Sequence, residues 1–371
     1  MKIIQIISDT NIGGAGKYLL AFLDNCDKSS FDTEVILPRG SRLARELKLR
    51  GVKFTETLYI GDKSFDYRAV SVLKELFTEA RPDIVHTHAV MSARLAARLF
   101  TKAKIVYTRH SVFDPPKRLT IFPAKQINGL LNGFFCDKIV AVSPAAAKNL
   151  TDVGVSPKKI EVIYNGVARL PSLSSKETAK IRESHGLSTG DFVCSIVARL
   201  VDIKGHEYVL SAARLLIEKA PDVKFLIVGT GPLLKEIKEQ AAELKNVVVA
   251  GFIKEIDEIM NITDVQLNAS YGTEATSLSL LEGMSIGKPA VATDFGGNPY
   301  VIRDGENGLI IPQKDAEAMA EAILRLRRDR ELYEKMSKRA NDIYLEDFTA
   351  RKMTRKICEL YESLAGNAGE R

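Results

Sequence analysis

Two glutamates eight positions apart, Glu274 and Glu282, are the residues in this sequence that most suggest carbohydrate chemistry. Between them, Thr276 or Ser277 can cap a helix that begins there. The start of a capped helix leaves backbone N–H groups and the positive end of the helix dipole available to a diphosphate or a sugar hydroxyl. Because carboxylates only accept hydrogen bonds, the two glutamates suit a ligand rich in hydroxyl groups, such as a sugar linked to a ribose.

Two cations supply complementary chemistry. Arg199 follows the apolar run at residues 192–198, and Lys204 lies in the turn after it. When a sugar diphosphate reacts, it releases a negatively charged leaving group, and cations at a strand end can stabilise that charge without a metal ion. The sequence therefore predicts that Arg199 and Lys204 contact a departing diphosphate, and it predicts no metal site.

The elements that would position these residues follow from an alternation of short apolar runs and amphipathic stretches, the pattern of parallel sheets with helical connections. The expected strands lie at residues 2–8, 33–38, 84–87, 105–108, 138–142, 192–198, 224–229, 247–250, 265–268, 289–293 and 308–311. A turn-rich stretch near residues 165–175 interrupts the series, and terminal helices are expected from about residue 316 onward. Ligands of such sheets bind beyond the carboxyl ends of the strands, where the residues singled out here fall.

Length and composition agree with two domains. A chain of 371 residues exceeds the ~250–300 residues at which a single core stops growing. No stretch approaches the ~20 apolar residues that span a bilayer, so a soluble, cytoplasmic protein is expected. The cysteines are too far apart in sequence for a zinc knuckle or a CxxC redox pair, and they are expected to be reduced thiols: Cys26, Cys136, Cys194 and Cys358.

Charge is distributed unevenly along the chain. Residues 1–170 carry 26 Lys and Arg against 16 Asp and Glu, a net charge of +10, whereas the remainder carries −4. This asymmetry suggests that the first domain faces an anionic partner, a membrane surface or an acidic acceptor, although ordinary solvated charge explains it equally well. Residues 113–125 mix basic and apolar side chains and suit a lipid headgroup surface, but their three prolines argue against a continuous amphipathic helix there. No nucleic-acid partner is expected.

With these motifs, the sequence resembles the retaining nucleotide-sugar glycosyltransferases of family 4 along nearly its whole length. The Glu, seven residues, Glu signature of that family matches Glu274 and Glu282, and its diphosphate-holding Arg and Lys match Arg199 and Lys204. The resemblance implies the α/β GT-B fold, with two Rossmann-like parallel-sheet domains facing a cleft. It implies an acceptor-side domain at residues 1–168, a donor domain at 169–349, and a last helix at about 350–371 that crosses back to the first domain.

The resemblance also implies roles for individual residues. The catalytic residues would be His110, Arg199, Lys204 and Glu274. The donor-binding residues would be Gly13, Gly14, Arg199, Lys204, Gly229, Phe252, Ile253, Glu274, Ala275, Thr276, Ser277, Leu278 and Glu282. Within this set Phe252 is placed beside the nucleotide base, Glu282 at the ribose, and Glu274 with the backbone of residues 275–278 at the sugar hydroxyls.

Three histidines match family motifs. His110 is expected at the rim of the active site, near the transferred sugar or the phosphate. His86 and His88 lie in an expected strand, and we predict that one of the two points into the core, His86 serving packing. Two positions depart from the usual family pattern: Ala275 stands where Gly is common and Gly283 where Ala is common, which predicts a donor pocket of altered shape.

The function implied by the resemblance is transfer, with retention of configuration, of a hexose-type sugar from a UDP- or GDP-sugar to a cell-envelope, polysaccharide or lipid-linked acceptor. UDP is favoured over GDP, and no cofactor is needed because the nucleotide-sugar is a substrate. A nucleotide-sugar 2-epimerase of the same architecture and a non-catalytic carbohydrate-binding subunit are the alternatives. A nicotinamide oxidoreductase is disfavoured, because residues 13–16 lack GxGxxG spacing and residues 37–39 lack a ribose-binding acid.

Overall fold

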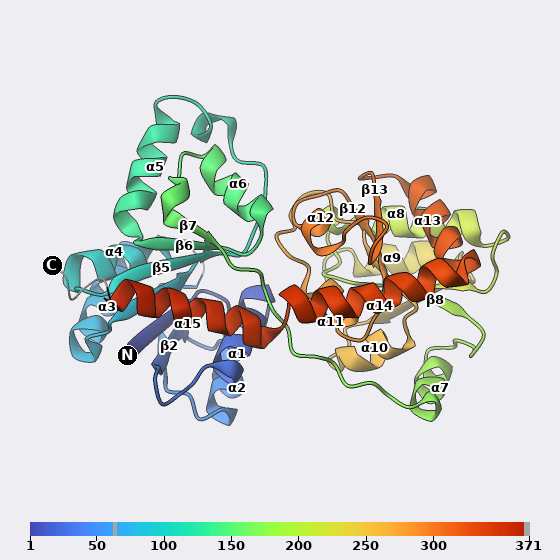
Figure 1. The fold of residues 1–371 in the computed structure, drawn as a ribbon, viewed down its shortest axis with the longest axis horizontal. Coiled ribbons are helices and arrows are strands. Elements are labelled where there is room, and N and C mark those ends of the chain that lie inside the picture. The colour runs from blue at the N-terminus through green and yellow to red at the C-terminus, as the bar shows by residue number, and fades with distance from the viewer. Residues whose placement is uncertain (62–64, 367–371) are drawn as a thin grey trace. The chain divides into compact units, whose positions relative to one another are not determined.

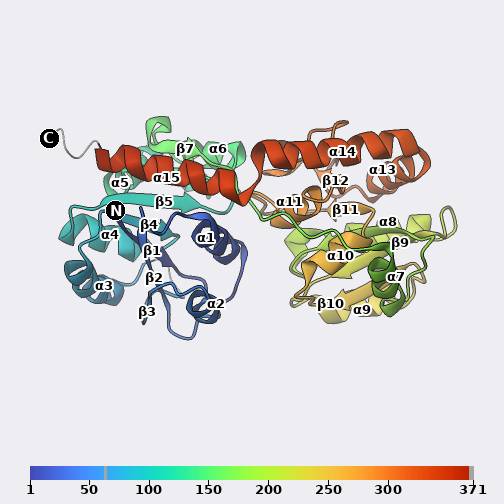
Figure 2. The same cartoon turned by 60° about the horizontal axis from the view of Figure 1, so that its bottom comes forward.

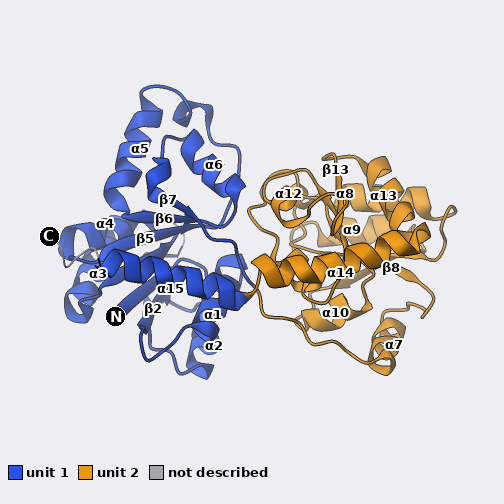
Figure 3. Cartoon of the chain, viewed as in Figure 1, with its two compact units in different colours: residues 1–166, 350–371 blue, residues 167–349 orange. Residues whose placement is uncertain are grey.

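The computed structural model describes residues 1–61 and 65–366, and these form two compact units (Figure 3). Unit 1 comprises Met1–Gly166 together with the chain from Ala350 onward, and unit 2 comprises Val167–Thr349. The predicted domains were residues 1–168 and 169–349, with the last helix returning to the first domain. In the structure the chain enters unit 2 at Val167, whose backbone N–H bonds to the carbonyl of Phe348 at the point where the chain leaves.

Unit 1 is built on a parallel sheet of seven strands within the described residues, in the order β3-β2-β1-β4-β5-β6-β7. The strands are β1 (Lys2–Ile7), β2 (Asp32–Pro38), β3 (Phe54–Thr57), β4 (Ile84–His88), β5 (Lys104–Arg109), β6 (Lys138–Ala141) and β7 (Ile160–Val162). The helices are α1 (Gly14–Asn25), α2 (Leu43–Leu49), α3 (Tyr67–Ala80), α4 (Met91–Phe100), α5 (Ala124–Phe135), α6 (Pro144–Asp152) and α15 (Ala350–Gly366), with short 3-10 turns at η1 (Lys117–Leu119) and η2 (Pro157–Lys159).

Helices cover both faces of this sheet. Helices α3 and α4 pack on one face through small and apolar side chains such as Leu73 and Ala93. The other face is covered by α1 and α15, which bury Leu19 and Ile357 against it. Figure 1 and Figure 2 both show α15 lying along the sheet of unit 1, so this helix completes a core begun by the first strand.

The contact between α1 and α15 brings two cysteines together. The Sγ atoms of Cys26 and Cys358 lie 3.9 Å apart, although 332 positions separate them in the chain. The distance exceeds the ~2.05 Å of a disulfide, so both are free thiols. The sequence spacing did not predict this pair.

Unit 2 contains a parallel sheet of six strands within the described residues, in the order β10-β9-β8-β11-β12-β13. The strands are β8 (Phe192–Val197), β9 (Val223–Val228), β10 (Val247–Gly251), β11 (Val265–Asn268), β12 (Ala290–Thr293) and β13 (Gly308–Ile311). The helices are α7 (Ser175–Ser184), α8 (His206–Leu216), α9 (Leu234–Ala241), α10 (Ile256–Ile262), α11 (Leu278–Met284), α12 (Asn298–Val301), α13 (Ala316–Arg328) and α14 (Arg330–Asp347), and η3 (Asp202–Lys204) is a 3-10 turn.

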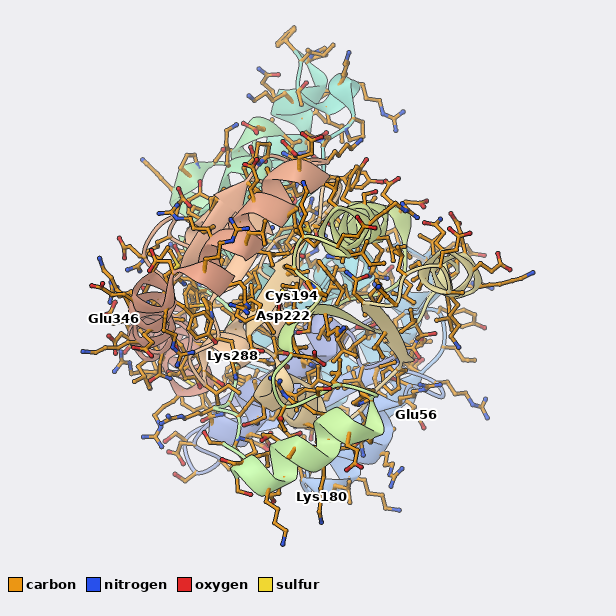
Figure 4. The ribbon with its side chains drawn as sticks, turned by 90° about the vertical axis from the view of Figure 1, so that its right-hand side faces the viewer. Glu56, Lys180, Cys194, Asp222, Lys288 and Glu346 are labelled. Carbon is orange, nitrogen blue, oxygen red and sulfur yellow. The ribbon has the colours of Figure 1, made fainter. Side chains whose placement is uncertain are left out.

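The core of unit 2 lies on both sides of its sheet. Strand β8 sends Cys194 into the larger cluster, where α8 and α13 add Val209 and Ile323. Helix α7 begins with a capping box formed by Ser174 and Glu177, which satisfies backbone donors at its start. Figure 4 shows Cys194 inside the unit, whereas Lys180 points outward from α7, as an amphipathic surface helix requires.

The predicted α/β fold with two parallel sheets is confirmed, and every predicted strand overlaps an observed one. Two strands were not predicted, β3 and β7. Both lie at the edges of the sheet, where most of their side chains remain partly or fully exposed, so neither carries the apolar run that marks a buried strand.

Candidate functional site

The charged residues of unit 2 gather where the order of its strands reverses. The chain adds β9 and β10 on one side of β8 and then returns to place β11 on the other side, in register with β8. Ligands of open α/β sheets bind beyond the carboxyl ends of strands at such a switch point. Lys204 follows β8, and Glu274 follows β11, so this topology brings together two residues 70 positions apart.

Lys204 and Glu274 form a buried ion pair. The Nζ of Lys204 donates to Oε2 of Glu274 over 2.8 Å, and the side chains are only 14% and 10% exposed. The ammonium group also reaches the carbonyl of Thr273 at 3.2 Å and Oγ of Ser270 at 3.4 Å. Among the described residues no hydrogen bond reaches Oε1 of Glu274, so that oxygen can accept from a ligand hydroxyl. The sequence analysis assigned Lys204 to the diphosphate and Glu274 to the sugar hydroxyls of the donor. It did not predict that the two side chains pair with each other.

A frame of neutral polar side chains holds the Glu274 carboxylate. Asn268, the last residue of β11, donates from Nδ2 to Oε2 of Glu274 at 3.2 Å, and the hydroxyl of Ser270 donates to the same oxygen at 3.2 Å. Behind them, the amide of the fully buried Asn298 donates to Oδ1 of Asn268 and to Oγ1 of Thr293. Sequence reasoning missed these residues. The signal was present, because Asn268 ends an apolar strand at the edge where ligand-binding residues were expected.

A glycine pair holds the backbone at Glu274 and Ala275. The N–H of Gly297 donates to the carbonyl of Glu274 at 2.9 Å. A Cβ added to Gly297 would lie 1.8 Å from the carbonyl oxygen of Ala275, and one added to Gly296, whose φ is +58°, would lie 2.1 Å from the carbonyl oxygen of Glu274. Only glycine permits this approach of one backbone to another. The loops after β11 and β12 are thereby fixed against each other.

Helix α11 starts where the sequence predicted. Of the two candidate caps, Ser277 is the N-cap residue, and its Oγ accepts from the N–H of Leu280 at 3.5 Å. Thr276 is buried beside it and bonds its hydroxyl to the carbonyl of Ala275. Glu282 lies in the second turn of α11 and is 7% exposed, so the two glutamates of the signature are both buried in unit 2.

The departure at Gly283 has a structural explanation on the inner side of α11. A Cβ at this position would meet the carboxamide of Gln266 at 2.3 Å. That carboxamide donates to the carbonyls of Leu280 and Lys288, so Gln266 fills the space that an alanine side chain would need. The glycine at position 283 is thus explained by packing between α11 and β11, and a donor pocket of altered shape stays a prediction.

The other predicted donor residues lie at the same edge of the unit 2 sheet. Arg199 follows β8, is exposed, and makes no ion pair with any described residue. Gly229 follows β9 with φ of +147°, and a Cβ there would lie 1.9 Å from the carbonyl oxygen of Ala198. Phe252 and Ile253 follow β10, and the Phe252 side chain is 72% exposed. An exposed aromatic ring and an unpaired guanidinium suit contacts with a base and a diphosphate.

A buried histidine beside Lys204 was also missed. His206 opens α8 and is 2% exposed, and neither ring nitrogen has a hydrogen-bond partner among the described residues. Burial, together with the nearby charge of Lys204, lowers the pKa of His206 to about 4, which keeps the ring neutral at pH 7.

The remaining predicted site residues, Gly13, Gly14 and His110, lie in unit 1. Gly13 is the N-cap residue of α1 and Gly14 its first residue, so the glycine turn leads from β1 into a helix start. His110 follows β5 and is partly exposed. Its Nε2 lies 2.8 Å from Nδ1 of His88, and burial lowers the pKa of His110 to about 3.

The prediction that only one of His86 and His88 points into the core is wrong. Both are buried, and their rings stack with centroids 4.7 Å apart. Side chains two positions apart on a strand project from the same face, so the pair shares one environment. Burial lowers the pKa of His86 to about 3 and that of His88 well below its usual value.

Unit 1 also carries an exposed apolar surface that extends the predicted segment at residues 113–125. Helix α5 begins after the last proline and buries none of its residues. The large apolar side chains of this surface are at least 41% exposed: Phe113, Ile121, Phe122, Ile127, Leu130, Leu131 and Phe134. Two exposed cations of η1, Lys117 and Arg118, adjoin it. Within the described residues no helix is long and apolar enough to cross a membrane.

Comparison with known protein families gives two matches, one in each half of the chain. The model described as Glycosyltransferase Family 4 matches residues 12–169, and the model described as Glycosyl transferases group 1 matches residues 177–342. The two matches together cover most of both units.

In the described chain, no group of three or more His, Cys, Asp or Glu residues is arranged to hold a metal ion.

Individual proteins agree with the family models. The chain is 29% identical over 307 residues to a putative glycosyltransferase, EpsD, of Bacillus subtilis, covering 78% of this chain and 79% of that protein. It is 29% identical over 322 residues to a UDP-Gal:alpha-D-GlcNAc-diphosphoundecaprenol alpha-1,3-galactosyltransferase of Escherichia coli, covering 81% of each. Its fold matches Anabaena Alr3699/HepE, solved in complex with UDP and glucose, with a TM-score of 0.83, 21% identity, and coverage of 98% and 100%. A glycosyltransferase from Rickettsia africae matches with a TM-score of 0.84 and 23% identity, covering 98% of each chain.

Proposed function

The chain belongs to glycosyltransferase family 4 and has the GT-B fold of that family, and we propose that it transfers a hexose-type sugar from a nucleotide-sugar to a cell-envelope, polysaccharide or lipid-linked acceptor. The observation that carries this proposal is the cluster at the switch point of unit 2, where Arg199, Lys204 and Glu274 follow neighbouring strands. A carboxylate with one open acceptor oxygen, paired with Lys204 and accompanied by the exposed Arg199 after the neighbouring strand, fits a ligand that combines sugar hydroxyls with a diphosphate.

The chemistry follows from these groups. The bond between the sugar C1 and the diphosphate oxygen breaks, the acceptor oxygen bonds to C1, and the acceptor proton passes to the departing phosphate oxygen. Arg199 and Lys204, in place of a metal ion, neutralise the departing charge, while Oε1 of Glu274 accepts from a sugar hydroxyl. Glu282 takes the ribose and Phe252 the base. We propose retention through an oxocarbenium-like state on one face of the sugar, and a trapped covalent glycosyl-enzyme would contradict it.

We favour UDP over GDP as the nucleotide. The name of the Escherichia coli galactosyltransferase gives UDP-Gal as its donor, and Anabaena Alr3699/HepE was solved with UDP. Thermal stabilisation by a panel of UDP-, GDP- and ADP-sugars tests this choice. Stabilisation by UDP-sugars that is lost in Lys204→Ala and Glu282→Ala supports the donor site, and stabilisation by GDP-sugars alone contradicts the choice of UDP. If none of the sugars stabilises the folded protein, the non-catalytic alternative gains support.

Product analysis with donor alone separates transfer from epimerisation. A 2-epimerase converts the nucleotide-sugar into its isomer without an acceptor, whereas the proposed transferase leaves the sugar configuration unchanged. Nucleotide-sugar incubated with the protein and then resolved from its epimer therefore distinguishes the two activities. Appearance of the epimer would overturn the proposal.

We also propose that the apolar surface of residues 113–134 contacts an anionic membrane, at its cytoplasmic face, where a lipid-linked acceptor is presented. Phe122 and Leu130 are 79% and 75% exposed, which is costly in water and favourable at a bilayer interface. Lys117 and Arg118 supply the attraction to anionic headgroups. The net charge of +10 over residues 1–170 acts in the same direction.

Vesicle flotation tests this contact. The protein is expected to float with vesicles that contain phosphatidylglycerol and to float less with pure phosphatidylcholine. The double variant Phe122→Ser/Leu130→Ser is expected to lose binding. The control Leu49→Ser removes an apolar side chain that is 72% exposed on α2, outside the surface, and is expected to bind normally. Failure of the unaltered protein to float with anionic vesicles contradicts the membrane contact and leaves the donor site untouched.

A further inference from the structure

A chain of hydrogen bonds runs through the core of unit 1 from His110 to the last helix. Nε2 of His110 lies 2.8 Å from Nδ1 of His88, and Nε2 of His88 lies 3.0 Å from Oε1 of Gln5 on β1. The Nε2 of Gln5 in turn donates to the phenol oxygen of Tyr361 on α15 at 2.9 Å. Gln5, His88 and Tyr361 are at most 2% exposed.

The chain continues beyond Tyr361. The phenol oxygen contacts Nδ1 of His86, and Nε2 of His86 lies 2.6 Å from the hydroxyl oxygen of Thr108. His86 and Thr108 are also buried. Gln5 of β1 and His86 of β4 therefore both contact Tyr361, which is 275 positions away from His86 in sequence.

With its oxygen toward His88 and its nitrogen toward Tyr361, the amide of Gln5 gives every bond in this chain one direction. Its oxygen can only accept and its nitrogen can only donate. Nε2 of His88 must therefore carry the hydrogen that is donated to Gln5. A neutral imidazole has one N–H group, so Nδ1 of His88 accepts, and the hydrogen of that bond sits on Nε2 of His110. The Nδ1 of His110 is then left with a lone pair and no hydrogen.

The other half of the chain agrees with this direction. The phenol oxygen of Tyr361 already accepts from Gln5, so its own O–H is directed at Nδ1 of His86. His86 then carries its hydrogen on Nε2 and donates it to Thr108. With this direction, every hydrogen bond in the chain joins one donor to one acceptor. This is the expected arrangement, because buried polar groups rarely remain unpaired.

We propose that Gln5 and Tyr361 are positioning residues that hold His110 in the tautomer with hydrogen on Nε2, so that its Nδ1 accepts a hydrogen bond from a carbohydrate hydroxyl. His110 is partly exposed as a residue, and among the described residues no hydrogen bond reaches its Nδ1. The carbohydrate role rests on the proposed function. The tautomer itself follows from the core of unit 1 alone. The last helix thereby acts on His110 through the phenol group of Tyr361.

NMR of protein labelled with ¹⁵N-histidine tests the tautomer directly. The protein has five histidines, so the ring signals can be assigned by single substitutions. At pH 7.5 we expect a protonated Nε2 and an unprotonated Nδ1 for His110. A hydrogen on Nδ1 of His110 in the unaltered protein would mean that the whole chain runs in the opposite direction, and would overturn the proposal.

Two variants test the positioning residues. Tyr361→Phe removes the phenol and is expected to give His110 a mixture of tautomers. Tyr344→Phe is the matched control, because Tyr344 is a buried tyrosine of α14 whose hydroxyl donates to the carbonyl of Val167 and which has no link to the chain. If Tyr361→Phe does not fold, Gln5→Leu removes the acceptor of His88 instead. An unchanged His110 tautomer in a folded Tyr361→Phe or Gln5→Leu protein contradicts the positioning role.

An activity measurement separates this inference from the proposed function. Loss of one neutral hydrogen bond to the ligand corresponds to a fall of roughly tenfold in kcat/KM, which we expect for Tyr361→Phe and not for Tyr344→Phe. An inactive protein with the expected tautomer would contradict the function and leave the chain intact. An active protein with the opposite tautomer would contradict the proposed direction of the hydrogen bonds and leave the proposed function intact.

Discussion

Both units place polar side chains at the switch point of a parallel sheet. In unit 2 these side chains are charged, whereas in unit 1 they are neutral. In unit 2 the strands β8 and β11 bring Lys204 and Glu274 into an ion pair. In unit 1 the equivalent strands β1 and β4 bring together Gln5 and His88, which are buried and neutral. The same topology thus holds an ion pair in one unit and hydrogen bonding without charge in the other, because the side chains on these strands and in the loops after them differ.

Neutralising the unit 2 cluster should have the largest effect. We expect Lys204→Met to lower kcat/KM by at least about 100-fold, the usual cost of losing one donor to developing charge. It should also destabilise unit 2 by roughly 3–5 kcal/mol, because the buried carboxylate of Glu274 loses its partner. Steady-state kinetics and urea unfolding measure the two effects.

The double variant Lys204→Met/Glu274→Gln sharpens this test. It removes both charges, so part of the stability should return while activity stays low. The control Lys235→Met removes a lysine of α9 whose ion pair with Glu239 is exposed, and it should change neither quantity appreciably. Activity of Lys204→Met within threefold of the unaltered protein would remove Lys204 from the mechanism.

The next effect concerns the backbone that supports the unit 2 site. Gly297→Ala should cost about 3 kcal/mol of stability or more, because its Cβ would lie 1.8 Å from the carbonyl oxygen of Ala275 and both loops must move. Gly190→Ala is the control, since a Cβ there meets nothing within 4 Å. Chemical denaturation of both variants checks the difference, and equal stabilities would show that the two loops are not rigidly packed.

The neutral network of unit 1 should make stability depend on pH. The pKa of His86 is lowered to about 3 in the folded protein, whereas an unfolded histidine titrates near 6.5. Below pH 6.5 the unfolded state therefore binds protons that the native state does not, and the free energy of unfolding falls as pH falls. For His86 alone the loss between pH 7 and pH 5 amounts to about 2 kcal/mol.

Unfolding curves between pH 7 and pH 5 measure this loss, and His88, whose pKa is also lowered by burial, adds to it. The variant His86→Gln removes one of these titrating groups and should flatten the dependence. A stability that does not change over this interval would mean that the folded and unfolded proteins bind equal numbers of protons, and it would contradict the lowered pKa values of His86 and His88.

The smallest effect concerns the packing beneath α11. Gly283→Ala should destabilise unit 2 by about 1 kcal/mol, because overpacking against Gln266 costs ~1–3 kcal/mol and the gain in helix propensity offsets ~1 kcal/mol of it. Gly283→Ala/Gln266→Ser makes room for the methyl group and should recover part of the loss. If the single variant is as stable as the unaltered protein, Gln266 is free to move, and the departure at Gly283 has no packing cause.

The parts of the fold that could be read from the sequence are those with a strong local signal. The buried strands carry apolar runs. The helix cap expected at Thr276 or Ser277, and the Glu274 and Glu282 pair, have distinctive residue types at fixed spacing. The edge strands β3 and β7 lack such runs and were missed. The shared face of His86 and His88 was available from strand periodicity, and the prediction misapplied it.

Contacts between distant segments had no such signal. Asn268 gave a hint, as a polar residue that ends a buried strand, but its bond to Glu274 depends on the path of the loop after β11. The pairing of Lys204 with Glu274, the fit of Gln266 against Gly283, and the contact of Cys26 with Cys358 join segments that are far apart in the chain.

Residue types and local periodicity determined the two parallel sheets, the strand ends that carry chemistry, and the kinds of groups found there. Only the folded chain decided which of these groups meet, because strand order and helix packing set the distances between them. The direction of the hydrogen-bond chain at His110 is the clearest case. It depends on Gln5 and on Tyr361, which lie 356 positions apart and come together only when the last helix covers the first strand.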